Sequence, residues 1–522
     1  MISAVKYDAA LWSRKLIVMD PITEHTHPAD VSFDGGDLDC GGGLLLLIRR
    51  HIDPMARGGL LEIRSTDTSV EGDLPAWCRL TGNELVSWTK SGQQRSYLVC
   101  KGKLTERTAT QASPGTGSES AKQLVVPVTI PAHLPSPAPA PLIAPLSVMG
   151  IGSWPRPRWM LRAVHEYLEG RMAEGEFQNT ADDAVRLAVA AQLRAGVDVV
   201  TDGEQRRDSY ASFVGSRLDN CQLIPLSDLT AMVDDPEKFE QELRALDVPA
   251  ADVRHPVVYG PLGRSRPLAV QELEFVQTLT DKPVKVALPG PYLLTRTMWL
   301  DCLKENPYRN REALAEDVVR VLREELHGLL AAGAALVQFD EPVLTEVVFT
   351  GAKTQRSFMC GALSEKKSPE HELAFASELI NAVVQGLPRE RVALHICRGN
   401  WTRHDVACLA GDFRPLLGLL KAMNVGTLFL ELCTPRAGEM EVLACLPADK
   451  RIGVGVVNQK ENYIEHVRDI WPKIRKAIEL FGSERVLLTP DCGFATFADN
   501  PITDSELAEA KLWAIRNARD RL

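Results

Sequence analysis

Residues 335–340 and 392–397 read ALVQFD and VALHIC, and they are two of eight short apolar runs that decide the fold. Each run has the length of a strand, and longer stretches with helical periodicity lie between the runs. Such alternation predicts an α/β fold with a parallel sheet covered by helices, here a closed (β/α)8 TIM barrel. An open, doubly wound sheet is the main alternative. The expected strands are Leu146–Gly152, Val197–Thr201, Lys285–Pro289, Ala335–Asp340, Val392–Cys397, Thr427–Glu431, Ile452–Asn458 and Val486–Pro490.

A change in composition divides the part of the sequence that precedes this barrel. Residues 102–145 are rich in Pro, Ala, Ser, Thr and Gly and end in PSPAPAPLIAP. Such a segment cannot bury enough apolar surface to fold, and its prolines favour an extended form. We therefore expect a linker at 102–145, between a small module at 31–101 and the barrel at 146–522. Residues 1–30 are expected to be an N-terminal extension.

The small module is predicted to have the order β-α-β-α-β-β. Strand-like and helical runs alternate over residues 31–101, and Ser91-Gly92 lies between the last two strand-like runs, where a hairpin turn is expected. Ser69 precedes the second helical run and is expected to cap it. About seventy residues are enough for a two-layer α+β domain.

Charge and hydropathy limit the classes of partner. The chain of 522 residues has a net charge of −10, which argues against a nucleic-acid binder because such proteins need a basic face. No apolar run is long enough to cross a membrane, and the first residues do not have the pattern of a secretory leader. The 11 cysteines have no regular spacing, so we expect reduced thiols and a cytoplasmic location.

Metal-binding side chains collect at the expected strand ends, where barrel enzymes place their chemistry. His395 and Cys397 are two residues apart on one strand, so their side chains point the same way. Glu431 and Cys492 follow later strands and complete a set of nitrogen, sulfur and oxygen ligands suited to zinc, with Glu431 as the exchangeable ligand. Each residue alone also fits a plain structural role, as a buried thiol or a salt-bridged strand end.

Seven segments occur in the order found in the C-terminal catalytic barrel of cobalamin-independent methionine synthase, which residues 146–520 resemble. These segments are IGSWPRP, TDGEQRRDS, ALPGPYLL, QFDEPVL, LHICRGNW, LFLELCTPRAG and LLTPDCGFAT. The resemblance implies a zinc-dependent S-methyltransferase that converts homocysteine into methionine.

The resemblance also assigns roles to residues. It implies that His395, Cys397, Glu431 and Cys492 are the zinc ligands. The residues that match the family's binding site for the amino-acid end of homocysteine are Ile151, Ser153, Glu204 and Asp340. Trp299 falls near the tryptophan on which the family stacks the pterin of its methyl donor.

The chain departs from the family in two places. Asn458 lies in Val456–Gln459, where the family has a histidine that serves the methyl donor's proton, and asparagine cannot act as a general acid. The residues before 146 do not resemble the family's second, N-terminal barrel. Both departures leave the methyl donor open between a methyl-folate and a methyl-corrinoid protein.

The small module resembles the TusA-type sulfur carriers, through LDCGGG at 38–43 and LLEIRSTDTSVEGDLPAWCRLTGNELV at 60–86. That family carries its thiol in a cysteine–proline pair at the start of the first helix, where the helix dipole activates it. Here Cys40 is the nearest candidate, without the proline. The resemblance implies a docking or sulfur-delivery arm, with a sulfur-transfer protein as its partner.

Two other functions remain open from the sequence. One is a zinc-dependent alkyltransferase that acts on another thiol, either of the coenzyme M type or supplied by the sulfur-carrier module. The other is a non-catalytic scaffold for sulfur trafficking. The related uroporphyrinogen decarboxylase barrel needs no metal, so the four ligand-type residues argue against it.

Overall fold

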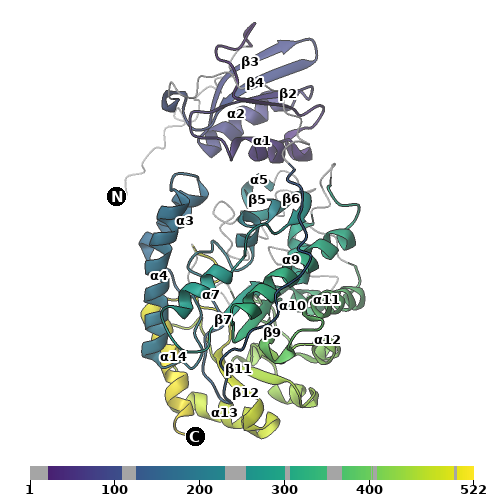
Figure 1. The fold of residues 1–522 in the computed structure, drawn as a ribbon. Helices are drawn as coiled ribbons and strands as arrows, with labels where there is room; N and C mark the ends of the chain where they lie inside the picture. Colours follow the sequence, from purple (N-terminus) through teal and green to yellow (C-terminus); the bar gives the residue numbers. More distant parts are fainter. Residues whose placement is uncertain are drawn as a thin grey trace, which may run out of the picture. The chain divides into compact units, whose positions relative to one another are not determined.

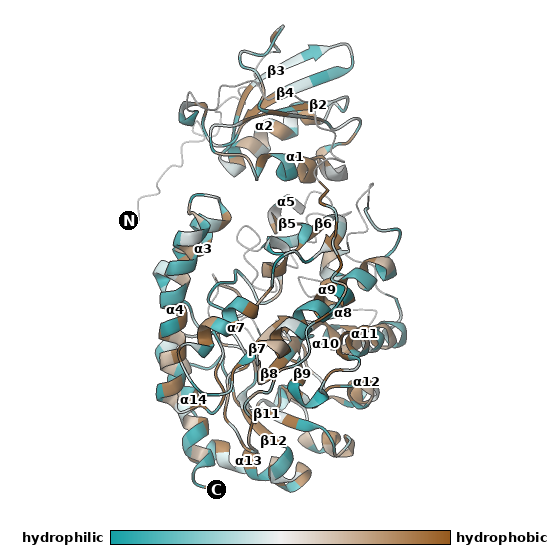
Figure 2. Cartoon of the chain, in the orientation of Figure 1, coloured by the Kyte–Doolittle hydropathy of each residue, from teal (hydrophilic) through white to brown (hydrophobic). Residues whose placement is uncertain are grey.

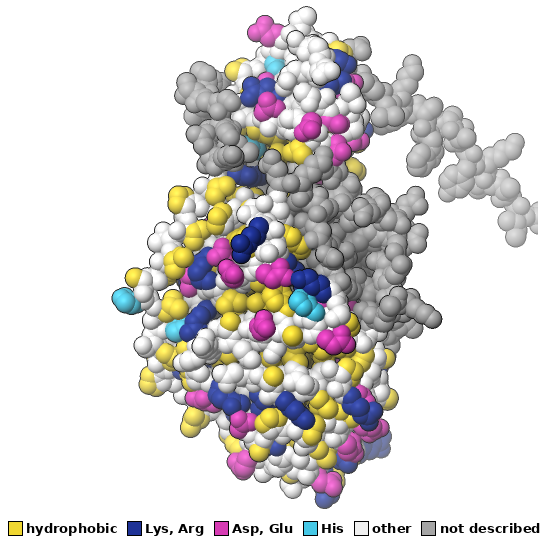
Figure 3. Space-filling model, turned by 90° about the vertical axis from the view of Figure 1, so that its right-hand side faces the viewer, with side chains coloured by type: hydrophobic (Ala, Val, Ile, Leu, Met, Phe, Trp, Pro, Cys, Tyr) yellow, Lys and Arg dark blue, Asp and Glu magenta, His cyan; other side chains and the backbone are white. Residues whose placement is uncertain are grey.

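The computed structural model describes residues 21–107, 125–229, 254–299, 306–349, 367–400, 403, 408–498 and 502–522. The chain divides into two compact units, Met1–Leu124 and Val125–Leu522 (Figure 1). On the face in Figure 3, acidic and basic side chains are mixed rather than gathered by sign. Among the described residues, no helix has both the length and the apolar character that crossing a membrane requires.

The small unit is a four-stranded sheet with two helices on one face (Figure 1). The sheet order is β1-β2-β4-β3, with β1 parallel to β2 and β4 antiparallel to both β2 and β3. The predicted order β-α-β-α-β-β is confirmed. The elements are β1 Val31–Asp34, α1 Leu45–Ile52, β2 Leu60–Ser65, α2 Val70–Thr81, β3 Glu84–Ser91 and β4 Gln94–Cys100, with a π-helical turn at Cys40–Leu44 before α1.

Two details of the small unit differ from the expectation. Ser69 adopts helical backbone angles and its hydroxyl donates to Asp67, so the predicted capping role of Ser69 is wrong. The end of the expected N-terminal extension joins the sheet, because the Ile22 amide donates to the Trp88 carbonyl and the Asp30 amide to that of Leu60.

The large unit is built around six parallel strands in the order β12-β11-β10-β9-β8-β7. These strands are β7 Lys285–Pro289, β8 Leu336–Asp340, β9 Val392–Ile396, β10 Thr427–Leu430, β11 Arg451–Val457 and β12 Val486–Pro490. Nearly every residue in them is buried, as continuous apolar runs require in a parallel sheet that is covered on both faces. Figure 2 shows the strands as mostly hydrophobic and the helices as more hydrophilic.

Two further segments join the edges of this sheet. Parallel bridges link Val148 to Leu488, Met149 to Val199, and Val200 to Val284, the residue before β7. The two expected strands near residues 146–152 and 197–201 are therefore present as short extended segments between β12 and β7. This arrangement agrees with the predicted closed barrel rather than with an open sheet.

Helices lie between the strands along the chain, and most of them lie around the outside of the barrel (Figure 1). They are α3 Arg158–Leu168, α4 Glu174–Ala195, α5 Leu226–Leu229, α7 Val270–Gln277, α8 Pro291–Met298, α9 Arg311–Ala331, α10 Val343–Phe349, α11 Pro369–Val384, α12 Leu417–Ala422, α13 Val467–Phe481 and α14 Ser505–Arg519. An antiparallel pair of strands, β5 Asp219–Pro225 and β6 Arg254–Gly263, forms a separate two-stranded sheet outside the barrel.

The second half of the expected linker belongs to the large unit. The Val126 amide and carbonyl both hydrogen-bond to the side chain of Asn220. Farther on, Ala138 donates to the Leu330 carbonyl and accepts from Arg391. Residues 125–145 are therefore held along the outside of the barrel, which moves the start of the large unit from 146 to 125.

Candidate metal and substrate site

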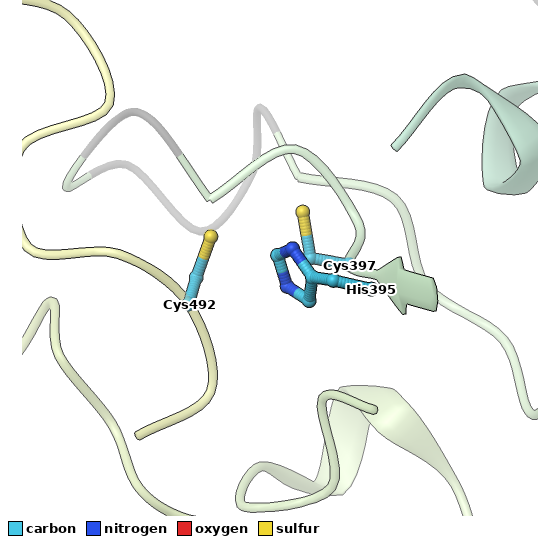
Figure 4. Close-up of side chains that lie close together, drawn as sticks. All are labelled: His395, Cys397 and Cys492. Atoms are coloured by element: carbon cyan, nitrogen blue, oxygen red, sulfur yellow. The ribbon is translucent and has the colours of Figure 1, made fainter. Parts of the chain in front are cut away.

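Three metal-binding side chains meet at the carboxyl end of the strands. His395 lies in β9, Cys397 follows directly after it, and Cys492 lies in the loop after β12. One ligand atom of each, an imidazole nitrogen or a sulfur, lies within 4.8 Å of the other two. Figure 4 shows His395 and Cys397 at the end of one strand, with Cys492 facing them from another loop. The spacing of His395 and Cys397 on a strand explains the first pair, and the closing of the sheet brings Cys492 to them.

A carboxylate orients the imidazole of His395. Asp340, the last residue of β8, accepts a hydrogen bond from His395 Nδ1 at 2.7 Å, because Asp340 and His395 are paired across the β8–β9 register. A carboxylate can only accept, so Nδ1 carries a proton, and Nε2 is the nitrogen that offers a lone pair in the neutral form of the ring. His395 Nε2 is buried and has no hydrogen-bond partner among the described residues. This is the arrangement by which proteins prepare a histidine for a metal ion.

The two thiols differ in acidity. The hydrogen bond with Cys492, helped by the charge of His395, lowers the pKa of Cys397 to about 7 although burial opposes the change. The same hydrogen bond and burial raise the pKa of Cys492. One thiolate is therefore available at neutral pH, and a cation placed between the sulfurs would favour a second.

Glu431 lies outside this group of three. Its Oε2 accepts from the backbone amide of Arg398 at 2.9 Å and from the Asn400 amide at 2.6 Å, and its Oε1 accepts from Arg436. The structure thus gathers three of the four predicted ligands, while the fourth is fully buried and bound to protein donors. Glu431 as a ligand stays a prediction.

The four residues expected to bind the amino-acid end of homocysteine line the same small cavity as the metal-binding group. The lining of this cavity is Ile151, Ser153, Glu204, Tyr210, Asp340, Pro342, His395, Cys397, Asn400, Cys492, Gly493 and Thr496. Its volume of about 30 Å³ has room for one or two water molecules, so an amino acid needs the lining to move apart. The sequence alone did not point to Tyr210, Asn400 or Thr496, although each lies in or beside a quoted segment.

Glu204 is the most unusual residue of the cavity. It has a positive φ of 56°, a conformation that non-glycine residues rarely adopt outside functional sites. Its Oε2 is buried and has no hydrogen-bond partner among the described residues. Burial raises the pKa of Glu204 to about 7, although Arg207 opposes the shift. A Cβ on Gly152 would lie 2.2 Å from Glu204 Oε1, so only glycine leaves room for this carboxylate.

The other three predicted site residues lie elsewhere. Trp299, which follows α8, and Asn458, which follows β11, do not line the cavity. The side-chain oxygen of Asn458 accepts from the backbone amide of Lys460, and the backbone amide of Asn458 donates to the Glu465 carboxylate. Cys40 begins the turn before α1, as expected, but it is 4% exposed, and burial raises its pKa to about 12.

Comparison with known proteins identifies the large unit. Residues 146–511 match the family described as cobalamin-independent synthase, catalytic domain. The chain belongs to this family. It is 27% identical to the methionine synthase of Saccharolobus solfataricus over 345 residues, which cover 66% of this chain and 86% of that protein. The methionine synthase of Sulfolobus acidocaldarius is 25% identical over 344 residues, with 66% and 84% covered.

Solved structures share the fold. A B12-independent methionine synthase from Shewanella sp. W3-18-1, in complex with selenomethionine, superposes with a TM-score of 0.54 at 22% identity, over 72% of this chain and 98% of that one. A putative B12-independent methionine synthase from Listeria monocytogenes gives a TM-score of 0.50 at 19% identity, over 73% and 99%. At these identities, the likeness supports the barrel fold of the cobalamin-independent synthase family and no more.

Proposed function

We propose that this protein is a zinc-dependent methyltransferase that transfers a methyl group to the thiol of homocysteine to give methionine. The observation that carries the proposal is the convergence of His395, Cys397 and Cys492 in one cavity with Glu204 and Asp340. His395 Nε2 is buried there and has no hydrogen-bond partner in the described part of the chain. Membership of the cobalamin-independent synthase family and relatives called methionine synthases support the same reaction.

The three side chains fit a zinc ion. One imidazole nitrogen and two sulfurs are ligands that zinc accepts in a tetrahedral site, and soft thiolates favour it over magnesium or calcium. Three protein ligands leave a position for the substrate sulfur. When bound, zinc lowers the pKa of a coordinated thiol, so that the thiolate exists at neutral pH.

Glu204 and Asp340 are suited to the α-ammonium group of homocysteine. Glu204 Oε2 is a buried acceptor without a partner, which an ammonium group would satisfy with a charge-assisted hydrogen bond. The backbone around Ser153 is proposed to bind the α-carboxylate. Held in this way, the substrate sulfur attacks the methyl carbon in line; a sulfur–carbon bond forms, and the electrons of the broken bond leave with the donor.

The donor is proposed to be a methyl-folate or a methyl-corrinoid protein. Trp299 and Asn458 do not line the cavity, and their part in binding the donor stays a prediction. For the small unit, we propose a docking or sulfur-delivery role of the TusA type. Its two-layer order of strands and helices supports this role, while the burial of Cys40 argues that any reaction of this thiol needs an opening of the core.

Purified protein, assayed with homocysteine and each donor class and analysed for zinc, tests the proposal. We expect one zinc ion per chain and methionine as the product. His395→Gln should abolish both zinc binding and turnover, while the matched change His255→Gln, at a buried histidine of β6 that bonds a backbone carbonyl, should leave both in place. Zinc-free protein with full activity, or product formation with other thiols only, would disprove the assignment.

A further inference from the structure

A buried lysine lies inside the barrel below the candidate site. Lys285, the first residue of β7, is fully buried, and its Nζ lies 4.4 Å from the centre of the Phe429 ring. A lysine is almost never fully buried unless its ammonium group is paired. Here Nζ donates a 2.7 Å hydrogen bond to an amide oxygen, Oε1 of Gln338. The position therefore needs an explanation other than an ordinary ion pair.

Lys285 begins a chain of hydrogen bonds that ends at the metal-binding histidine. Gln338 Nε2 donates to Asp340 Oδ1 at 2.7 Å, and the same oxygen accepts from His395 Nδ1 at 2.7 Å. The order of strands explains the chain, because β7, β8 and β9 are neighbours and Gln338 and Asp340 lie two residues apart on the same face of β8.

The hydrogen bonds between Lys285, Gln338 and Asp340 have only one direction from donor to acceptor. An ammonium group can only donate, so Lys285 fixes Gln338 with its oxygen toward Nζ and its NH₂ toward Asp340. Asp340 then accepts twice, which keeps the proton of His395 on Nδ1 and the lone pair on Nε2. Burial lowers the pKa of Lys285 to about 7, against the charges of Asp340 and Glu204. A neutral amine can both donate and accept, but the Asp340 carboxylate only accepts, so the NH₂ of Gln338 still points toward Asp340 when Lys285 is neutral.

We propose that Lys285 is a positioning residue that sets the zinc affinity of the site, by holding His395 through Gln338 and Asp340 with Nε2 toward Cys397 and Cys492. The proposal rests on the proposed function, because it assumes that zinc is the resident metal. Lys285 does not touch the metal-binding group itself; it acts through the orientation of one amide and one imidazole.

The test is the zinc dissociation constant of the full chain, measured by competition with a chromogenic chelator. Lys285→Met keeps an unbranched side chain, one heavy atom shorter, and removes every donor. We expect its dissociation constant to rise about 10- to 100-fold, the effect typical of losing an outer partner of a metal-bound histidine. Lys450→Met is the matched control, because Lys450 is also buried but donates to the backbone carbonyls of Met423 and Val425. Its zinc affinity should equal that of the wild type.

A second variant covers the case in which Lys285→Met does not fold. Gln338→Met keeps roughly the volume and removes both the acceptor for Lys285 and the donor to Asp340, so it should weaken zinc binding as well. In the double variant Lys285→Met/Gln338→Met, the loss should be smaller than the product of the two single losses, because both changes break the same chain.

The outcomes separate this proposal from the proposed function. A wild-type protein that binds no zinc overturns the proposed function. A wild-type protein that binds zinc, with folded Lys285→Met and Gln338→Met variants of equal affinity, overturns the role of Lys285 alone. The visible spectrum of the cobalt-substituted protein gives a second measurement, since a displaced His395 changes the d–d bands and a merely destabilised fold does not.

Discussion

A set of one histidine and two cysteines among the buried residues of the small unit can be compared with the metal-site set of the barrel, and the two sets differ in chemistry. In the small unit, these residues are His51, Cys40 and Cys78. Burial raises the pKa of both thiols to about 12 and lowers that of His51 to about 4, while the His51 ring stacks on Phe33 with 4.5 Å between ring centres. All three are therefore neutral core residues at pH 7.

In the barrel, burial is as complete, but polar neighbours oppose its effect. Asp340 raises the pKa of His395 against burial, and Cys492 lowers that of Cys397. Residue type and burial alone are therefore not sufficient for a metal site. A carboxylate that fixes the imidazole, and a second thiol at hydrogen-bond distance, are what separate a candidate ligand group from a packed core.

The largest expected difference between the two sets is in thiol reactivity. Cys397 and Cys40 are alike in exposure, 5% and 4%. In metal-free protein at pH 7, their pKa values of about 7 and about 12 make the thiolate fractions differ roughly 10⁴- to 10⁵-fold. Iodoacetamide labelling followed by peptide mass spectrometry should modify Cys397 first and Cys40 only on unfolding. Equal labelling of both would show that the thiols of Cys397 and Cys40 do not differ in reactivity.

Removal of one thiol from each set should affect activity very differently. Cys397→Ala should reduce methyl transfer by more than about 100-fold, because loss of an outer partner of a metal ligand already costs 10- to 100-fold. Cys78→Ala should leave turnover unchanged and destabilise the small unit by about 1 kcal/mol, the typical effect of a core substitution. Steady-state kinetics and thermal melting measure the two effects. A loss of turnover in Cys78→Ala would show that the small unit contributes to catalysis.

Glu204→Gln tests the buried acceptor of the barrel cavity. Removing its charge should lower kcat/KM for homocysteine about 10- to 100-fold, from the 1.5–3 kcal/mol that a hydrogen bond to a charged group contributes. The kcat/KM of the wild type for homocysteine should also fall in acid. Only the ionised carboxylate attracts an ammonium group, so below pH 7 its fraction falls about tenfold per pH unit.

The ratio of the two enzymes separates this effect from titration of the substrate thiol. Wild-type kcat/KM divided by that of Glu204→Gln should decline as pH falls from 8 to 5. A ratio that stays constant over this range would show that Glu204 does not meet the ammonium group.

The last expected effect is on the stability of the two units. Zinc at 100 times its dissociation constant should stabilise the large unit by about 2.7 kcal/mol and leave the small unit unchanged. Calorimetry with zinc and then with a chelator should move only the transition of the large unit. A shift of the small unit instead would place metal at His51, Cys40 and Cys78.

Much of the fold followed from local patterns. The eight strand positions, the order of elements in the small unit and the hairpin at Ser91-Gly92 were all predicted, because burial on both faces and turn chemistry leave direct marks in a sequence. The start of the large unit was predicted too late. Proline-rich composition indicates an extended chain, and composition does not tell whether that chain is held by partners such as Asn220 and Arg391.

For the candidate site, the sequence by itself determined the pair His395 and Cys397, because side chains two apart on a strand share one face. Only the tertiary structure decided which distant groups reach that pair. Cys492 does so because the sheet closes, Glu431 is bound by Arg398, Asn400 and Arg436, and Lys285 reaches His395 through two other side chains. Strand order and register set most of these contacts, and most of them join residues from different strands or strand ends rather than neighbours in the sequence.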